Sequence, residues 1–194
     1  MLINTIGNTP MIKINYEYKG KNKYIYTKLE YYNLTGSIKD RVAYYIINNA
    51  MKRGELKEGM PIIEATSGNT GIALAALGRF YNHPVYIFMP DWVSKERKDL
   101  IRNYGANIIL FSKEEGGFIR CVEEANKMVD LDNKKIPEDI DYDKIHNLAS
   151  EAKQKLKQIR PTSIGQALRI SGVNPADISL IMVYIKKEYF YEQR

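Results

Sequence analysis

The stretch that decides the fold covers residues 61–71 and has the sequence PIIEATSGNTG. Its first half is a short apolar run typical of a buried strand, and its second half is a turn of small and hydroxyl-bearing residues that leads into a helical pattern. A strand, a glycine-containing turn and a helix in this order gather backbone N–H groups at the positive end of a helix dipole. The stretch therefore predicts an anion-binding loop, although an ordinary turn without a ligand also fits the motif when it stands alone.

The sequence around this stretch alternates between helical and strand patterns. Helices are predicted over residues 39–52, 69–81, 94–104 and 117–128, and strands over residues 61–65, 85–89 and 108–111. Short apolar strands separated by helices of this length are typical of parallel strands with crossover helices. Residues 1–128 are thus predicted to form an open α/β unit with a parallel sheet.

A second candidate site comes directly before the first of these helices. Residues 33–41 have the sequence NLTGSIKDR, which places a flexible turn before a helix and Lys39 at the helix start. The positive end of a helix dipole disfavours an ammonium and so favours the neutral amine that a Schiff base requires. The alternative is a solvated lysine with no chemical role.

Together, the lysine motif and the TSGNTG loop resemble the cysteine synthase family of fold-type II (tryptophan synthase β-like) pyridoxal-phosphate enzymes. The resemblance extends over residues 6–10, 28–30 and 89–97 and covers about two-thirds of the chain. It implies that Lys39 forms the Schiff base with pyridoxal 5'-phosphate and later transfers a proton, and that Asn69 binds the phenolic oxygen of the cofactor. It also implies an amino-acid substrate, O-acetylserine, which reacts with sulfide to give cysteine. The substrate carboxylate would be held by Thr66, Ser67, Gly68 and Thr70.

The same resemblance predicts an incomplete site. The family places its phosphate-binding loop, and the partner of the pyridine nitrogen, in a second domain whose motifs do not occur in this sequence. Gly116-Gly117 is followed by Phe118-Ile119-Arg120 and not by a threonine-rich cradle. We therefore expect weak cofactor retention and little or no β-replacement activity. Residues 24–29, which in the family pack on that second domain, are expected to leave an apolar edge unless the tail covers it. Such an uncovered edge is a candidate surface for self-association.

The composition changes after Val129. Residues 129–140 are charged and contain Pro137, so a linker is expected there. Residues 141–194 are predicted to form a small all-α module of three helices, over residues 150–159, 163–170 and 175–191. Ser150 and Asn174 are the expected N-caps of the first and last of these helices.

Residues 134–187 resemble the C-terminal end of MnmG, also called GidA, a tRNA-modifying flavoenzyme family that works with the partner MnmE. This resemblance implies contact with MnmE or tRNA, whereas the family's flavin site lies far upstream, so no FAD site is expected here. Candidate RNA or partner contacts are Arg160, Ser163, Gln166 and Arg169. The alternative is that the three helices only close a small core beneath solvated charges.

Bulk composition narrows the remaining choices. A single cysteine and two histidines predict neither a disulfide nor a metal site. The net charge of +6 suits a phosphate-rich partner without requiring one. With no membrane span and no secretory signal in view, a cytoplasmic protein is expected. Three hypotheses remain: an enzyme fragment, an RNA- or MnmE-binding module, and a chimeric fusion with no integrated function, which the incomplete sites favour.

Overall fold

The computed structural model describes residues Leu2–Phe190, so Tyr191, the predicted end of the last helix, lies outside the described residues. The chain divides into two compact units, Met1–Ala125 (unit 1) and Asn126–Arg194 (unit 2). Each unit has its own hydrophobic core. The two units are therefore described separately.

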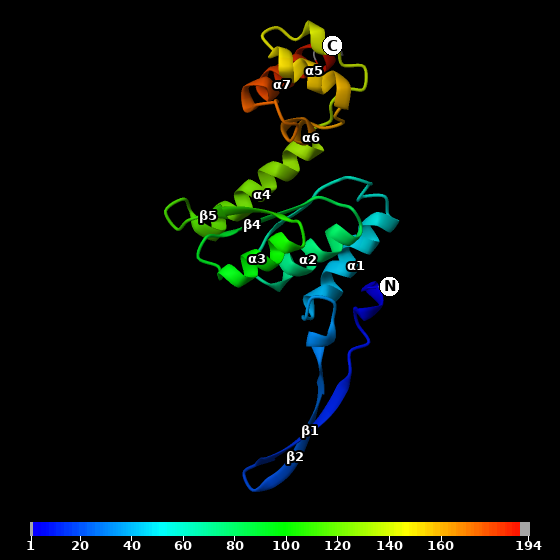
Figure 1. Cartoon of the computed structure of the whole chain (residues 1–194), viewed down its shortest axis with the longest axis vertical. Coiled ribbons are helices and arrows are strands. Elements are labelled where there is room, and N and C mark those ends of the chain that lie inside the picture. Colours follow the sequence, from blue (N-terminus) through cyan, green and yellow to red (C-terminus); the bar gives the residue numbers. More distant parts are fainter. Residues whose placement is uncertain (1, 191–194) are drawn as a thin grey trace. The chain divides into compact units, whose positions relative to one another are not determined.

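Unit 1 contains the parallel sheet that the sequence predicted. Its strands β3 (Ile62–Ala65), β4 (Val85–Pro90) and β5 (Asn107–Phe111) lie side by side in the order β3-β4-β5. Ile62 pairs with Val85, and Tyr86 pairs with Asn107, with all strands parallel. The connections are the helices α2 (Asn69–Phe80) and α3 (Lys95–Asn103), while α1 (Lys39–Lys52) precedes the sheet (Figure 1). The open α/β fold with crossover helices is confirmed.

Helix α2 is the centre of this unit. Its residues 71–78 are all buried because they are small or aliphatic around the whole circumference of the helix. One side of α2 packs on Ala43 and Ile47 of α1. The other side belongs to the core that includes Val85 and Ile87 of β4. The helix that follows the TSGNTG loop is therefore fixed from two sides.

An antiparallel hairpin precedes α1. Strands β1 (Met11–Tyr18) and β2 (Lys21–Lys28) pair along their full length, and the turn residues Lys19 and Gly20 both have positive φ, 50° and 70°. Such a two-residue turn matches the twist of a hairpin. The sequence indicated the apolar edge at residues 24–29 but not the partner strand β1. Short 3-10 turns flank the hairpin, η1 (Leu2–Thr5) before it and η2 (Glu30–Tyr32) after it.

Helix α4 (Gly117–Asn133) runs five residues beyond its predicted end at residue 128. The first residues of the expected linker are therefore helical. Further along the same segment, Ile136 and Ile140 are buried in the core of unit 2. The segment 129–140 thus contributes helical residues and two buried side chains to unit 2.

Unit 2 is the predicted helical module. It contains η3 (Tyr142–Lys144), α5 (Ser150–Ile159), α6 (Ile164–Leu168) and α7 (Pro175–Phe190). Asn174 caps α7 as predicted, because its Oδ1 accepts the N–H groups of Ala176 and Asp177 at 2.8 and 3.0 Å. The prediction for Ser150 is wrong: it is the first helical residue, and Ala149 occupies the cap position without a side-chain hydrogen bond. Among residues 2–190, no helix is both long and apolar enough to cross a membrane.

Candidate functional site

Lys39 is the first residue of α1, and its side chain is exposed. The turn before it is held from inside the protein. Asp40, which is fully buried, accepts the backbone N–H of Thr35 at 2.7 Å, and the backbone N–H of Lys39 donates to Ser37 Oγ at 3.2 Å. Within residues 2–190, Lys39 makes no ion pair. The turn is therefore fixed while the lysine amine stays available.

A cluster around Glu30 anchors the same turn to the N-terminal segment. Its carboxylate accepts hydrogen bonds from Arg41 Nε at 2.8 Å, Thr9 Oγ1 at 2.8 Å and Asn33 Nδ2 at 2.8 Å. The Arg41 hydrogen bond is the largest cause that lowers the pKa of Glu30 to about 2, followed by the Thr9 and Asn33 hydrogen bonds. Asn33 Oδ1 also accepts the backbone N–H of Gly7 at 2.8 Å. Residues before and after Lys39 in the sequence thus form hydrogen bonds that hold this turn in place.

The TSGNTG loop connects β3 to α2. The backbone N–H of Thr66 continues the pairing with β4, since it donates to Phe88 O at 3.0 Å, and Thr66 Oγ1 accepts the N–H of Gly68 at 3.3 Å. Arg97 Nη1 donates to Ser67 O at 2.9 Å. Gly68 occupies the N-cap position of α2 without a side-chain cap. The N–H group of Gly71 donates to Gly68 O at 3.1 Å, so the N–H groups of Asn69 and Thr70 are the ones at the helix start that retain their capacity to bind an anion.

The space around this loop suits a ligand. A Cβ placed on Gly68 would meet nothing within 4 Å, whereas one on Gly71 would approach Thr66 Cγ2 at 2.9 Å. The outer part of the loop is therefore open, and the inner part is tightly packed. Asn69 is exposed and begins α2, just as Lys39 begins α1. The packing of α1 against α2 connects the two candidate regions.

These residues fit part of a pyridoxal-phosphate site. They supply an accessible amine and an uncapped helix start with open space beside it, which are the groups that an aldehyde and an anion require. Among the described residues, no three His, Cys, Asp or Glu side chains gather as candidate metal ligands.

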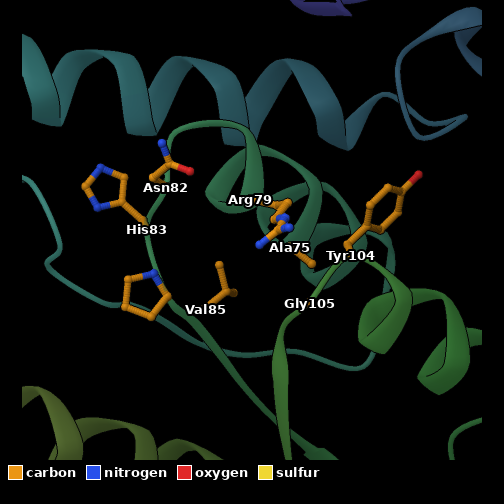
Figure 2. Close-up of a pocket in the computed structure, with 8 residues that line it drawn as sticks. Ala75, Arg79, Asn82, His83, Val85, Tyr104 and Gly105 are labelled. Carbon is orange, nitrogen blue, oxygen red and sulfur yellow. The ribbon is translucent and has the colours of Figure 1, made fainter.

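A hollow of about 210 Å³ lies elsewhere in unit 1 (Figure 2). Its lining includes Arg79 and His83, near the end of α2. It also includes Val85, the first residue of β4, and Gly105, which shortly precedes β5. This is the amino end of the sheet, whereas the TSGNTG loop follows the carboxyl end of β3. Ligands of open α/β sheets bind outside the carboxyl ends of the strands. His83 is buried with Nδ1 2.9 Å from Met60 O, which indicates a structural role.

In unit 2, the four candidate contact residues all make internal contacts. Arg169 Nη1 and Nη2 each lie 2.7 Å from a carboxylate oxygen of Asp132, and Ser163 Oγ lies 3.3 Å from the same carboxylate. Ser163 Oγ also caps α6 by accepting the Gln166 N–H at 3.1 Å. Gln166 Oε1 accepts the Thr162 N–H at 2.7 Å, and Arg160 Nη1 donates to Ile140 O at 3.1 Å. The four side chains therefore form hydrogen bonds within unit 2 that the sequence analysis did not predict.

A basic pocket in unit 2 was missed by the sequence analysis. It has a volume of about 290 Å³ and an apolar floor of Ile164, Met182 and Ile185. Lys134, Lys135 and Lys186 complete the lining. The adjacent pair Lys134-Lys135 was visible in the sequence, but the proximity of Lys186 depends on how the chain folds.

Comparison with known proteins gives two family matches that overlap over residues 124–152. Residues 2–152 match the family model for pyridoxal-phosphate dependent enzymes, and residues 124–194 match the model for the C-terminal helical bundle of the tRNA-modifying enzyme MnmG/GidA. Cysteine synthase B of Salmonella typhimurium is 48% identical over 112 residues, which are 58% of this chain and 37% of that protein. MnmG of Geobacillus thermodenitrificans is 50% identical over 90 residues, which are 46% of this chain and 14% of that protein.

Solved structures agree with the first match. The hydrogen sulfide-producing enzyme of Fusobacterium nucleatum superposes with a TM-score of 0.64 at 53% identity, over 66% of this chain and 39% of that chain. Cysteine synthase of Entamoeba histolytica superposes with a TM-score of 0.60 at 40% identity, over 67% of this chain and 39% of that chain. This chain thus spans less than half of each of these relatives, and its tail is similar to MnmG. Because the first family model covers residues 2–152, the chain belongs to the family of pyridoxal-phosphate dependent enzymes.

Proposed function

We propose that unit 1 carries the lysine side of a pyridoxal-phosphate site of the cysteine synthase type, and that this chain alone does not complete that site. The observation that carries the proposal is the exposed Lys39 at the start of α1, on a turn fixed by the buried Asp40 and by the Glu30 cluster. A fixed backbone with a free amine is the arrangement that covalent attachment of an aldehyde requires.

Each candidate residue then has a defined task. When bound, the cofactor supplies an electron sink for chemistry at an amino-acid substrate. Lys39 Nζ holds the cofactor and moves a proton, and the Asn69 side chain orients the cofactor ring. The substrate carboxylate binds at the start of α2, where Thr66, Ser67, Gly68 and Thr70 offer hydroxyl and N–H donors.

The proposal that the cofactor site is incomplete follows from the groups that a charged cofactor needs. A dianionic phosphate needs several donors, and a reversible bond to one lysine does not replace them. The relatives have more than half of their length outside the match, while here residues 124–194 match the helical bundle instead. We place the enzyme-like part at residues 1–128, the connection at 129–140 and the tail module at 141–194. The first part is expected to retain the cofactor weakly and to have little or no β-replacement activity.

Trapping with borohydride tests this function. The protein is incubated with pyridoxal phosphate and reduced either before or after gel filtration, and the labelled peptide is identified by mass spectrometry. We expect labelling at Lys39 when reduction comes first, and at least about tenfold less when gel filtration comes first. Lys39→Ala removes this label, whereas Lys52→Ala, at the other end of α1, keeps it.

Two outcomes would contradict the proposal in different ways. Labelling spread over surface lysines, with no preference for Lys39, would show that Lys39 is not a specific attachment site for the cofactor. Cofactor that survives gel filtration and supports steady conversion of O-acetylserine and sulfide to cysteine would show that the site is complete.

The tail supports a second candidate function, contact with tRNA or MnmE. The observation that favours it is the pocket lined by Lys134, Lys135 and Lys186, because lysines next to an apolar surface supply positive charge for phosphates and a contact for a base. The test is a tRNA mobility shift at increasing salt, together with a pull-down of MnmE. Replacing the three lysines by alanine should reduce the shift, and Lys155→Ala, on α5, should not. If tRNA, MnmE and Lys39 trapping all fail, the remaining hypothesis is a fused chain without an integrated function.

A further inference from the structure

The peptide unit between Ser67 and Gly68 is held partly from outside the TSGNTG loop. Its carbonyl oxygen accepts a hydrogen bond from Arg97 Nη1 at 2.9 Å, and its N–H group donates to Thr66 Oγ1 at 3.3 Å. The bond from Arg97 is the shorter of the two, and its donor is charged, which makes it the stronger contact. A side chain of α3 thus determines where this carbonyl oxygen points.

Gly68 leaves this peptide unit free to turn. Its backbone is extended, with φ −123° and ψ −163°, and a Cβ placed on it would meet nothing within 4 Å. A glycine in open space adopts many values of φ at little steric cost. Steric contacts at Gly68 therefore do not fix the orientation of the peptide unit, and its hydrogen bonds have to do so.

Arg97 is itself well placed to hold this peptide unit. It lies in the first turn of α3, and its backbone N–H donates to the N-cap side chain, Ser94 Oγ, at 3.4 Å. One turn later, the fully buried Ile101 places its Cδ1 3.4 Å from the position of a Cβ on Gly71. Residues four positions apart share one face of a helix, so Arg97 and Ile101 both face the start of α2, and α2 and α3 share one core (Figure 1). The packing of α3 on α2 therefore fixes the base of the Arg97 side chain.

The charge of Arg97 is not neutralised by a carboxylate within residues 2–190. Arg102 of the same helix, in contrast, lies 3.6 Å from Asp99. The Arg97 side chain is half-buried and contacts the residue that comes two positions before Asn69. A positive charge therefore lies beside the part of the loop where the N–H groups of Asn69 and Thr70 are free.

We propose that Arg97 is a positioning residue for binding of the α-carboxylate of an amino acid at the TSGNTG loop. The inference rests on the proposed function, because it takes the substrate carboxylate to bind at the start of α2. By holding Ser67 O, Arg97 keeps the negative end of this peptide dipole from turning towards a bound carboxylate. Its guanidinium also adds positive charge beside the free N–H groups of Asn69 and Thr70.

An NMR titration of the full, isotopically labelled chain without cofactor tests the inference at pH 7. The probe is L-serine, and L-serinamide, which lacks the carboxylate, is the ligand control. In the natural chain we expect L-serine to shift the amide signals of Gly68, Asn69 and Thr70, and L-serinamide at the same concentration to shift them less. Arg97→Ala should raise the dissociation constant of L-serine at least about fivefold.

Lys98→Ala is the matched control. Lys98 is the next residue of α3, and its Nζ also donates to a backbone carbonyl oxygen, Asp91 O, at 2.9 Å. Its replacement removes the same charge and the same kind of contact from a different loop, so the dissociation constant should change less than about twofold. Without ligand, Arg97→Ala should change the carbonyl carbon shift of Ser67, which reports its hydrogen bond, and Lys98→Ala should not.

Arg97→Lys tests rescue by a similar side chain. Because one nitrogen of Arg97 contacts Ser67 O, a lysine ammonium supplies both the charge and the donor. Its dissociation constant should therefore lie within about twofold of that of the natural chain. Far-ultraviolet circular dichroism of each variant checks that the fold is retained.

Each outcome has a distinct reading. Equal dissociation constants for the natural chain and Arg97→Ala would overturn the inference and leave the proposed function in place. An equal loss with Lys98→Ala, or no recovery with Arg97→Lys, would also overturn it, because the effect would then be one of overall charge or of local damage. If L-serine shifts no amide of the loop in the natural chain, both the inference and the carboxylate site fail. If Arg97→Ala weakens binding but Lys39 is not labelled, the inference stands and the cofactor site fails.

Discussion

Glu30 shows how a single side chain fixes the approach to the candidate lysine. Its carboxylate receives donors from Thr9, Asn33 and Arg41, which belong to three separate segments before and after it. Each of these hydrogen bonds favours the ionised carboxylate. The charge on Glu30 is therefore part of what holds the turn in front of Lys39.

The first prediction concerns pH. The pKa of Glu30 is lowered from 4.5 to about 2, so the unfolded state binds a proton more readily than the folded state between these values. The stability that Glu30 contributes is fully present above about pH 4.5 and is lost as the pH falls through about 2. Glu30→Gln should therefore be less stable than the natural chain at pH 6, and the gap should narrow towards pH 2.5.

Urea unfolding followed by Trp92 fluorescence provides the measurement, since Trp92 is the only tryptophan in the chain and lies in unit 1. Glu17→Gln, on the exposed hairpin, is the control. A gap between Glu30→Gln and the natural chain that stays constant from pH 6 to pH 2.5 would show that the network does not depend on the charge.

At this scale the sequence predicts candidate residues but not their partners. Lys39 and Asn69 were identified because each follows a recognisable turn and begins a helix, which are local features. Arg169 was predicted to be a contact residue, but its guanidinium binds Asp132, which is 37 positions away. No local sequence pattern predicts a contact between residues this far apart in the sequence. The assigned roles of Lys39, Asn69 and the TSGNTG loop residues remain predictions.

Among the elements, α2 was the most predictable. Its start, length and burial follow from a glycine turn and an unbroken run of small and aliphatic residues. Strand β1 was missed although its residues alternate between apolar and polar from Ile12 to Tyr18, a period of two that is typical of a strand. The end of α4 was missed because Asp130 and Asp132 begin a polar segment that resembles a linker, although Leu131 between them packs on the core of unit 2.

The second prediction concerns the contact between α2 and β4. A Cβ on Gly78 would lie 2.1 Å from Val85 Cγ2 and 3.3 Å from His83 O, so a methyl group does not fit. Alanine also has a better helix propensity than glycine, by about 1 kcal/mol, but the overlap is with a buried strand. Gly78→Ala should therefore destabilise unit 1 by about 1–3 kcal/mol.

Gly68→Ala is the matched control, because a Cβ there meets nothing within 4 Å. Its unfolding midpoint, measured by Trp92 fluorescence in urea, should change little. A Gly78→Ala variant as stable as the natural chain would mean that β4 moves away from α2 without cost, contrary to the close packing of this core.

At the scale of the whole molecule, each of the two family matches contains one of two separate cores in full, although the matches overlap over residues 124–152. The core of unit 1 is built around α2, and that of unit 2 is built around Leu156, Ile164 and Ile181. The sequence predicted this division from the change of composition after Val129. It did not predict that α4 would contribute residues on both sides of the boundary at Ala125.

The last prediction follows from the two cores: unit 2 should unfold without unit 1. Arg169→Ala breaks the paired contact with Asp132, whose side chain is 11% exposed while that of Arg169 is 23% exposed. Because both side chains are partly exposed to solvent, we expect the free energy of unfolding of unit 2 to fall by about 1–3 kcal/mol, less than for a fully buried pair. The loss should appear as an earlier phase in far-ultraviolet circular dichroism, because the helices of unit 2 contribute to that signal together with those of unit 1.

Trp92 fluorescence should keep its midpoint in the same variant, because Trp92 and its surroundings belong to unit 1. Arg102→Ala is the control from the other unit, since Arg102 lies 3.6 Å from Asp99 on the surface of α3 and its removal should change either probe by less than about 0.5 kcal/mol. Helix α4 is continuous across the boundary at Ala125 and so joins the two units covalently. If Arg169→Ala shifts the fluorescence and dichroism transitions by the same amount, the two units unfold as one cooperative unit, contrary to the prediction.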